Sequence, residues 1–186
     1  MVTDFDEEEA KNGICAETDY PYLQTQGTCA SSMCTPVPGS IVKDHVDIVP
    51  RKTNNLVAAL KVKPVTAAMV ANDPMFQFYS SGIFTSDTCG KVTKEMGAPD
   101  CKMLYPGQDV CLPDINHGVL VVGYGTDKTV EGDGPKDYFK VKNSWGSTWG
   151  EGGYFRLARA ETDPADPKGN WGMCAILSLL SYPDMK

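Results

Sequence analysis

The chain has 186 residues, of which 17 are basic and 24 acidic, so its formal net charge at neutral pH is −7. Hydrophobic residues make up 41% of the sequence, a share that fits an ordinary globular protein. A negative balance without clusters of Lys and Arg argues against nucleic acid or an anionic membrane surface as a partner, because both attract concentrated positive charge. No apolar run approaches the roughly 20 residues that a membrane-spanning helix requires.

The sequence contains seven cysteines, an odd number, so three internal disulfides at most would leave one sulfur without a partner inside the chain. This density is typical of secreted and endomembrane proteins, in which disulfides persist. Residues 1–9 are acidic and lack the basic start and the apolar stretch of a secretory signal. Two interpretations stay open: a leader is missing from this sequence, or the thiols remain reduced.

The first part of the chain is predicted to contain little regular structure. Residues 5–12 are typical of the end of a helix, with Gly13 at its left-handed C-terminal cap. Residues 20–22 and 35–39 are rich in proline, which fixes φ and disfavours helix in the residue before it. We therefore expect turns and extended segments there.

The rest of the chain is predicted to be mostly β. A short amphipathic helix is expected over residues 54–60, with Asn54 as its N-cap. Long loops are expected at residues 87–114 and 126–137, where Gly, Pro and charged residues gather. Runs of β-branched and aromatic residues predict two buried strands at 65–70 and 119–124 and two half-buried strands at 138–142 and 154–157.

Only two histidines are available for chemistry, His45 and His117. His45 follows Lys43 and Asp44 in a polar stretch and is interpreted as a surface histidine. His117 stands at the entry of an apolar strand, where an imidazole can face a cleft, and Asn143 is a candidate to orient it. Because no Cys-x-x-Cys pair occurs and no second histidine lies near either one, we predict neither a metal site nor any other cofactor.

A cysteine peptidase needs a thiolate nucleophile, an imidazole that takes and returns the proton, and a group that fixes the imidazole. Residues 116–125 read Asn-His-Gly-Val-Leu-Val-Val-Gly-Tyr-Gly, and residues 143–154 read Asn-Ser-Trp-Gly-Ser-Thr-Trp-Gly-Glu-Gly-Gly-Tyr. Both segments resemble the His and Asn boxes of the papain family of cysteine peptidases. The cathepsin L-like members are resembled most, because the occluding-loop histidine pair of cathepsin B is missing. Further matches lie at residues 20–22, 27–29, 64–65, 76–79, 82–84, 171–174 and 181–183.

The resemblance implies roles for individual residues. His117 would be the general base, Asn143 would hold its imidazole, and Trp145 would shield their hydrogen bond from water. Trp149 would line the primed side of the cleft, although tryptophans and glycines in this segment can equally serve to pack the barrel. The pocket for the second residue upstream of the cut would be apolar and walled by Ala68, Ile115, Gly118 and Leu179.

The implied fold is α+β and papain-like. Residues 46–186 would form the antiparallel β-barrel-like right-hand domain with the His/Asn site, and residues 1–45 would be a remnant of the helical left-hand domain with linking loops. The family's nucleophile lies in a Gly-Ser-Cys-Gly-Ser-Cys-Trp-like segment about 130–150 residues before the histidine, preceded by the glutamine of the oxyanion hole. Since His117 is too near the start of the sequence and no Trp follows Cys29 or Cys34, we expect both the nucleophile and this glutamine to be absent from the chain.

Six of the seven cysteines can be arranged in pairs. Cys111 and Cys174 match the family bridge that ties the strand of His117 to the C-terminal segment. Cys89 and Cys101 would close the long loop on itself. Cys15 and Cys34 would form the third pair. Cys29 would stay unpaired, because its family counterpart bonds to a cysteine of the helical domain.

Two functions from different classes follow. In the first, the chain is the C-terminal part of a cysteine endopeptidase of the lysosome, vacuole or extracellular space that cleaves peptide or protein substrates, and the chain alone is inactive. In the second, it is a non-catalytic homologue that serves as a binding or structural subunit. A protein partner would then cover the apolar face left exposed by the absent domain.

Overall fold

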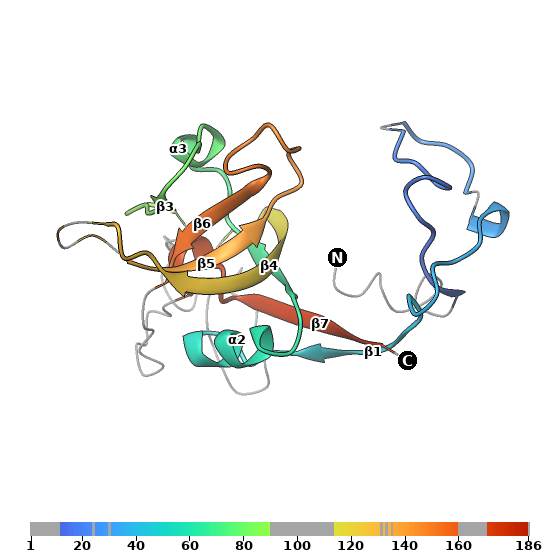
Figure 1. Cartoon of the computed structure of the whole chain (residues 1–186), viewed down its shortest axis with the longest axis horizontal. Helices are drawn as coiled ribbons and strands as arrows, with labels where there is room; N and C mark the ends of the chain where they lie inside the picture. The colour runs from blue at the N-terminus through green and yellow to red at the C-terminus, as the bar shows by residue number, and fades with distance from the viewer. Residues whose placement is uncertain are drawn as a thin grey trace, which may run out of the picture. The chain divides into compact units, whose positions relative to one another are not determined.

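The computed structural model describes residues 12–23, 25–29, 31–89, 114–130, 132, 134, 136–159 and 171–185. The chain divides into two compact units, Asp47–Leu180 and Met1–Val46 with Ser181–Lys186 (Figure 1). The predicted boundary between residues 45 and 46, with residues 46–186 as the barrel domain, stays a prediction. That the smaller unit is the remnant of a helical domain stays a prediction.

The larger unit is built on one sheet, mostly antiparallel as the sequence predicts. The strands are β2 (Val65–Met69), β3 (Ile83–Phe84), β4 (His117–Thr126), β5 (Asp137–Lys142), β6 (Tyr154–Ala158) and the start of β7 (Leu179–Met185). Their order is β7-β2-β4-β5-β6-β3. Strand β4 pairs antiparallel with both β2 and β5, β5 pairs antiparallel with β6, and β3 is parallel to β6. The predicted strands therefore correspond to β2, β4, β5 and β6.

Side chains alternate between the core and the other face of the sheet, as the two-residue period of a strand requires. In β2, Val65, Ala67 and Met69 are buried, whereas Thr66 and Ala68 are half-buried. The sequence predicts a strand buried throughout, so this alternation corrects the expectation. The largest fully buried side chains are Phe76, Phe139, Phe155, Leu56, Met69, Leu157, Ile176 and Leu177.

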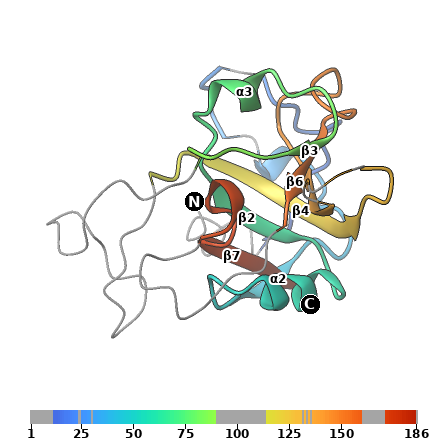
Figure 2. The same cartoon turned by 90° about the vertical axis from the view of Figure 1, so that its left-hand side faces the viewer.

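Two helices, α2 (Thr53–Leu60) and α3 (Pro74–Gln77), lie at opposite ends of this unit with sheet strands between them (Figures 1 and 2). Helix α2 begins one residue before the predicted N-cap Asn54, and the side chain of the actual N-cap residue, Lys52, makes no capping hydrogen bond. Burial of Thr53 and Leu56 on the core side fixes this start, so packing outweighs the capping preference of asparagine. Within the ranges given above, no helix has both the length and the apolar character needed to span a membrane.

The smaller unit contains the 3-10 turn η2 (Ser31–Met33) and strand β1 (Val42–Asp47), which lies beside β7 in the strand order. Gly13 has a φ of +83°, a left-handed conformation. The helix end predicted before it lies, apart from residue 12, outside the described residues. A bond between Cys15 and Cys34 closes this unit on itself, and this is the pair expected from the sequence. Cys29 is exposed and belongs to neither described disulfide.

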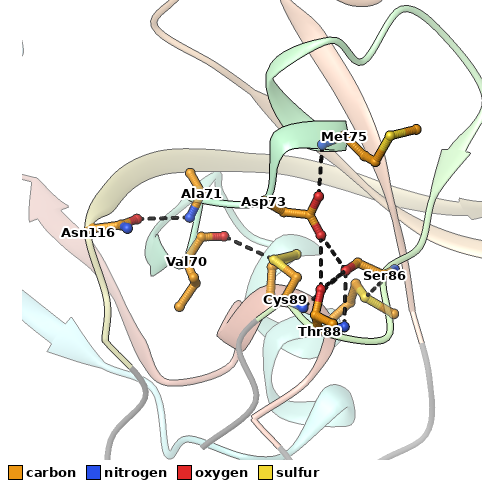
Figure 3. The surroundings of a disulfide bond; sticks show 10 residues. Val70, Ala71, Asp73, Met75, Ser86, Thr88, Cys89 and Asn116 are labelled. Carbon is orange, nitrogen blue, oxygen red and sulfur yellow. Dashed lines mark hydrogen bonds between the residues drawn. A yellow bond between two sulfur atoms is a disulfide. The ribbon is translucent and has the colours of Figure 1, made fainter. Parts of the chain in front are cut away.

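The second disulfide joins Cys89 to Cys174, so the predicted pairs Cys111–Cys174 and Cys89–Cys101 are wrong (Figure 3). The backbone of Val70 explains the pairing, because its N–H donates to the carbonyl of Cys174 at 2.9 Å and its carbonyl lies 3.2 Å from Sγ of Cys89. The resemblance to the family bridge points to Cys111, six residues before His117, whereas the structure pairs Cys89 with Cys174. Cys101 and Cys111 lie outside the described residues.

Candidate active site

The structure brings His117 and Asn143 together across two neighbouring strands. His117 is the first residue of β4, and Asn143 directly follows the end of β5. Because these strands are antiparallel, the start of one lies beside the end of the other. His117 Nε2 lies 2.8 Å from Asn143 Oδ1, a normal hydrogen-bond distance.

This hydrogen bond determines the tautomer of the neutral imidazole. The backbone N–H of Ser144 also donates to Asn143 Oδ1, at 2.8 Å, which identifies this amide atom as the oxygen. An amide oxygen only accepts, so Nε2 of His117 must carry the hydrogen. The lone pair is then on Nδ1, which is the nitrogen able to take a proton.

Two tryptophans lie beside this pair, and their predicted roles stay predictions. The ring of Trp145 lies 5.3 Å from that of His117, and Trp149 lies 5.0 Å from Trp145. Asn143 is only 7% exposed, whereas Trp145 is 38% exposed. The indole N–H of Trp149 donates to the carbonyl of Gln77 at 3.0 Å, which anchors that ring to α3.

The turn between β5 and β6 depends on glycine. Gly150 has a φ of +56°, and a Cβ there would lie 2.6 Å from the carbonyl oxygen of Tyr154. Gly153 has a φ of +89°, and its carbonyl accepts the backbone N–H of Asn143 at 2.9 Å. This turn therefore sets the backbone position of the residue that orients His117.

Three of the four residues predicted to wall a substrate pocket lie in neighbouring strands of the sheet, and the fourth lies just before β4. Ala68 in β2 is directly opposite Gly118 in β4. Leu179 is the first residue of β7, the strand next to β2, and Ile115 lies two residues before His117. All four are half-buried, and three of them carry apolar side chains.

A group of charged and polar residues that the sequence did not indicate lies beside the turn between β5 and β6. Both carboxylate oxygens of Glu151 accept Nε of Arg156 at 3.1 Å, and one also accepts Nη2 at 2.8 Å. The backbone N–H of Gly82 donates to the same carboxylate at 3.0 Å, and Nη1 of Arg156 contacts Asp127 at 2.5 Å. Glu151 belongs to the recognised Asn box, so its position could have pointed to this group, but its partners are distant in sequence.

The hydrogen bonds shift the acid–base equilibria of this group. For Asp127, donation by the hydroxyl and the backbone N–H of Thr129, followed by Arg156, lowers the pKa to about 2. Burial alone would raise the pKa of Glu151, but the hydrogen bonds from Arg156 and Gly82 outweigh it and lower that pKa. The same contacts raise the pKa of Arg156 above its usual value, the hydrogen bond to Glu151 most of all.

A second carboxylate holds the chain next to the His strand (Figure 3). Asp73 accepts the hydroxyl of Ser86 at 2.5 Å and the backbone N–H of Met75 at 2.8 Å, and the bond from Ser86 is the main cause of its lowered pKa. Close by, Asn116 Oδ1 accepts the backbone N–H of Ala71 at 2.8 Å. Residues just before α3 therefore fix the start of β4, where His117 lies.

Comparison with known proteins identifies the class to which this site belongs. The family model described as "Papain family cysteine protease" matches residues 1–98 and 103–183. Vignain from Vigna mungo is 36% identical over 183 residues, which is 98% of this chain and 41% of that protein. Cysteine endopeptidase Rep1 from Oryza sativa subsp. japonica is 34% identical over 183 residues, or 98% of this chain and 40% of that protein.

A solved structure shows the same fold. The Carica candamarcensis cysteine protease in complex with E-64 superposes with a TM-score of 0.67 and 29% identity, over 94% of this chain and 63% of that one. The α+β papain-like fold and the resemblance to cathepsin L-like members of the family are thereby confirmed. The chain spans about two fifths of the length of the curated relatives named above.

Proposed function

The chain belongs to the papain family of cysteine proteases, and on this premise we propose that it carries the histidine–asparagine half of an endopeptidase site. The observation that supports this most is the hydrogen bond of 2.8 Å between His117 Nε2 and Asn143 Oδ1. It leaves Nδ1 as the basic nitrogen and holds the ring in one plane. A general base needs both properties.

In the proposed reaction, Nδ1 of His117 takes the proton of a cysteine thiol, and the thiolate attacks the carbonyl carbon of the peptide bond. The imidazolium then returns the proton to the leaving amine, and water completes the hydrolysis of the thioester. Asn143 accepts the Nε2 hydrogen throughout and so keeps the same nitrogen available for each transfer.

The nucleophile is proposed to come from a segment that is not among these 186 residues. No cysteine in the sequence is followed by tryptophan. Disulfides hold Cys15, Cys34, Cys89 and Cys174, and a sulfur in a disulfide is no thiolate. We therefore expect the chain alone to be inactive.

The substrates proposed are peptides or proteins with an apolar residue second upstream of the cut, because Ala68, Ile115 and Leu179 would wall that pocket. The compartment proposed is an oxidising one, vacuolar, lysosomal or extracellular, since two disulfides occur among the described residues. In the alternative function, that of a non-catalytic binding or structural subunit, a protein partner would cover the apolar face that packs against the helical domain in papain-like proteins.

Labelling with E-64 followed by intact-mass measurement tests this proposal. The chain alone is expected to gain no adduct. A fusion that places the preceding part of Rep1 from Oryza sativa before this chain is expected to gain one adduct, on a cysteine of the Rep1 part.

The His117→Ala variant of the fusion should lose the adduct, whereas the matched His45→Ala variant should keep it. A folded fusion that takes up no E-64 would favour the non-catalytic subunit instead. An adduct on a cysteine of the chain alone would refute the assignment of the nucleophile to another segment.

A further inference from the structure

The carboxylate of Glu151 fastens the turn between β5 and β6 to two other parts of the larger unit. It accepts Nε and Nη2 of Arg156, which belongs to β6. It also accepts the backbone N–H of Gly82, which follows α3 in the chain. The side chains of Glu151 and Arg156 are only 26% and 23% exposed, so the pair is largely shielded from water.

The segment after α3 is fastened to β6 a second time, through Tyr79. Its hydroxyl donates to the carbonyl of Gly82 at 2.7 Å and accepts the backbone N–H of Arg156 at 3.2 Å. The Tyr79 ring lies 5.5 Å from that of Trp149. Glu151 and Tyr79 therefore hold the same three segments together: α3 with its extension, the turn, and β6.

The turn held in this way carries the contacts that place Asn143. Within it, the backbone N–H of Gly153 donates to the carbonyl of Trp149, and the carbonyl of Gly153 accepts the N–H of Asn143. The Trp149 ring packs on Trp145, which packs on the imidazole of His117. The contacts that lead from the turn to the His117–Asn143 hydrogen bond therefore run both through the backbone and through the rings.

We propose that Glu151 is a positioning residue for His117, acting through the turn to keep the imidazole in its Nε2–H tautomer. Its importance for catalysis rests on the proposed function, but the tautomer itself does not. Burial and the geometry of the bidentate contact make the carboxylate suited to this role, because an arginine and a carboxylate joined by parallel hydrogen bonds resist rotation.

The test is nitrogen-15 NMR of the imidazole rings in the 186-residue chain at alkaline pH, where the rings are neutral. The chain contains only two histidines, so the His45 signals serve as an internal reference. In the unmodified chain we expect His117 in the Nε2–H form alone. In Glu151→Ala we expect this single form to be lost and replaced by a mixture of both tautomers, with His45 unchanged.

Asp127→Ala is the matched control, because it removes the other carboxylate from the same guanidinium without touching the turn. It should leave the His117 tautomer unchanged. Glu151→Gln keeps an oxygen for the N–H of Gly82 and should restore part of the Nε2–H form.

A folded Glu151→Ala chain whose His117 signals match the unmodified chain would overturn the proposal. An equal change in Asp127→Ala would overturn it too, because the effect would then reflect stability alone. Should Glu151→Ala not fold, Arg156→Lys keeps the charge but loses the bidentate geometry, and it should produce the same mixture of tautomers. An unchanged His117 tautomer in that variant would equally overturn the proposal. None of these outcomes depends on whether the chain takes part in peptide cleavage.

Discussion

At the imidazole of His117, one amide oxygen decides which nitrogen is protonated. Asn143 Oδ1 accepts both His117 Nε2 and the backbone N–H of Ser144, so the amide cannot rotate without losing two hydrogen bonds. Sequence patterns predicted this pair, because both residues lie in short boxes of fixed spacing. They could not predict Glu151 as the partner of Gly82, because that contact joins residues 69 positions apart.

Asn143→Ala should lower kcat/KM of the active fusion by roughly 10²-fold, at the lower end of what a positioned acid–base group contributes. The reason is that the imidazole would lose the acceptor that fixes its tautomer. Steady-state hydrolysis of a dipeptidyl substrate measures this. The exposed Asn54 gives a control, since Asn54→Ala should leave the rate unchanged. Unchanged kcat/KM in Asn143→Ala would contradict the orienting role.

Among the single elements, the turn between β5 and β6 should contribute strongly to stability because of its glycines. Gly150→Ala should destabilise the protein by more than the roughly 1–2 kcal/mol that a left-handed residue with a side chain costs, because the added Cβ would also meet the Tyr154 carbonyl. Gly152→Ala is the control, with a φ of +67° but open space around its Cβ. Urea unfolding compares the two. Equal losses of unfolding free energy in the two variants would contradict the predicted clash between the added Cβ and the Tyr154 carbonyl.

The connection between β3 and β4 shows why two of the three predicted cysteine pairs are wrong, whereas Cys15–Cys34 agrees with the structure. Strand positions follow from alternating side chains, but a long connection leaves no such periodicity, and likeness to the family bridge selected Cys111 instead of Cys89. Likewise, the start of α2 followed the burial of Thr53 and not the capping preference of Asn54. The sequence thus predicts elements well and predicts their distant contacts poorly.

Cys111→Ser should leave the bond between Cys89 and Cys174 intact, and peptide mapping without reducing agent should recover that linked pair. Cys174→Ser should remove it and lower the free energy of unfolding by about 2–4 kcal/mol, because the unfolded chain gains freedom. Loss of the Cys89–Cys174 pair in Cys111→Ser, or recovery of Cys111 linked to Cys174 from the unmodified chain, would contradict the structure.

For the whole molecule, the free energy of unfolding should fall as the pH is lowered. Asp127 has a pKa near 2 in the folded protein, below the value of about 3.9 expected in the unfolded chain. A depressed pKa means that the unfolded state binds the proton more readily, so the stabilisation is complete above about pH 4 and is lost as the pH falls toward 2. The lowered pKa of Glu151 acts in the same direction.

Asp127→Asn should therefore flatten the fall in unfolding free energy between about pH 4 and pH 2. Thr129→Ala, which removes the largest cause of the low pKa, should flatten it in part. Urea unfolding at a series of pH values measures both. A slope that stays as steep in Asp127→Asn would show that other groups control the acid transition.

The rate of peptide hydrolysis by the Rep1 fusion tests whether His117 supplies the base of a cysteine endopeptidase site. The active fusion should cleave a dipeptidyl substrate with an apolar residue at the second position, and His117→Ala should lower kcat/KM by about 10²- to 10⁴-fold. His45→Ala should leave it unchanged. A His117→Ala fusion as active as the parent would contradict the account.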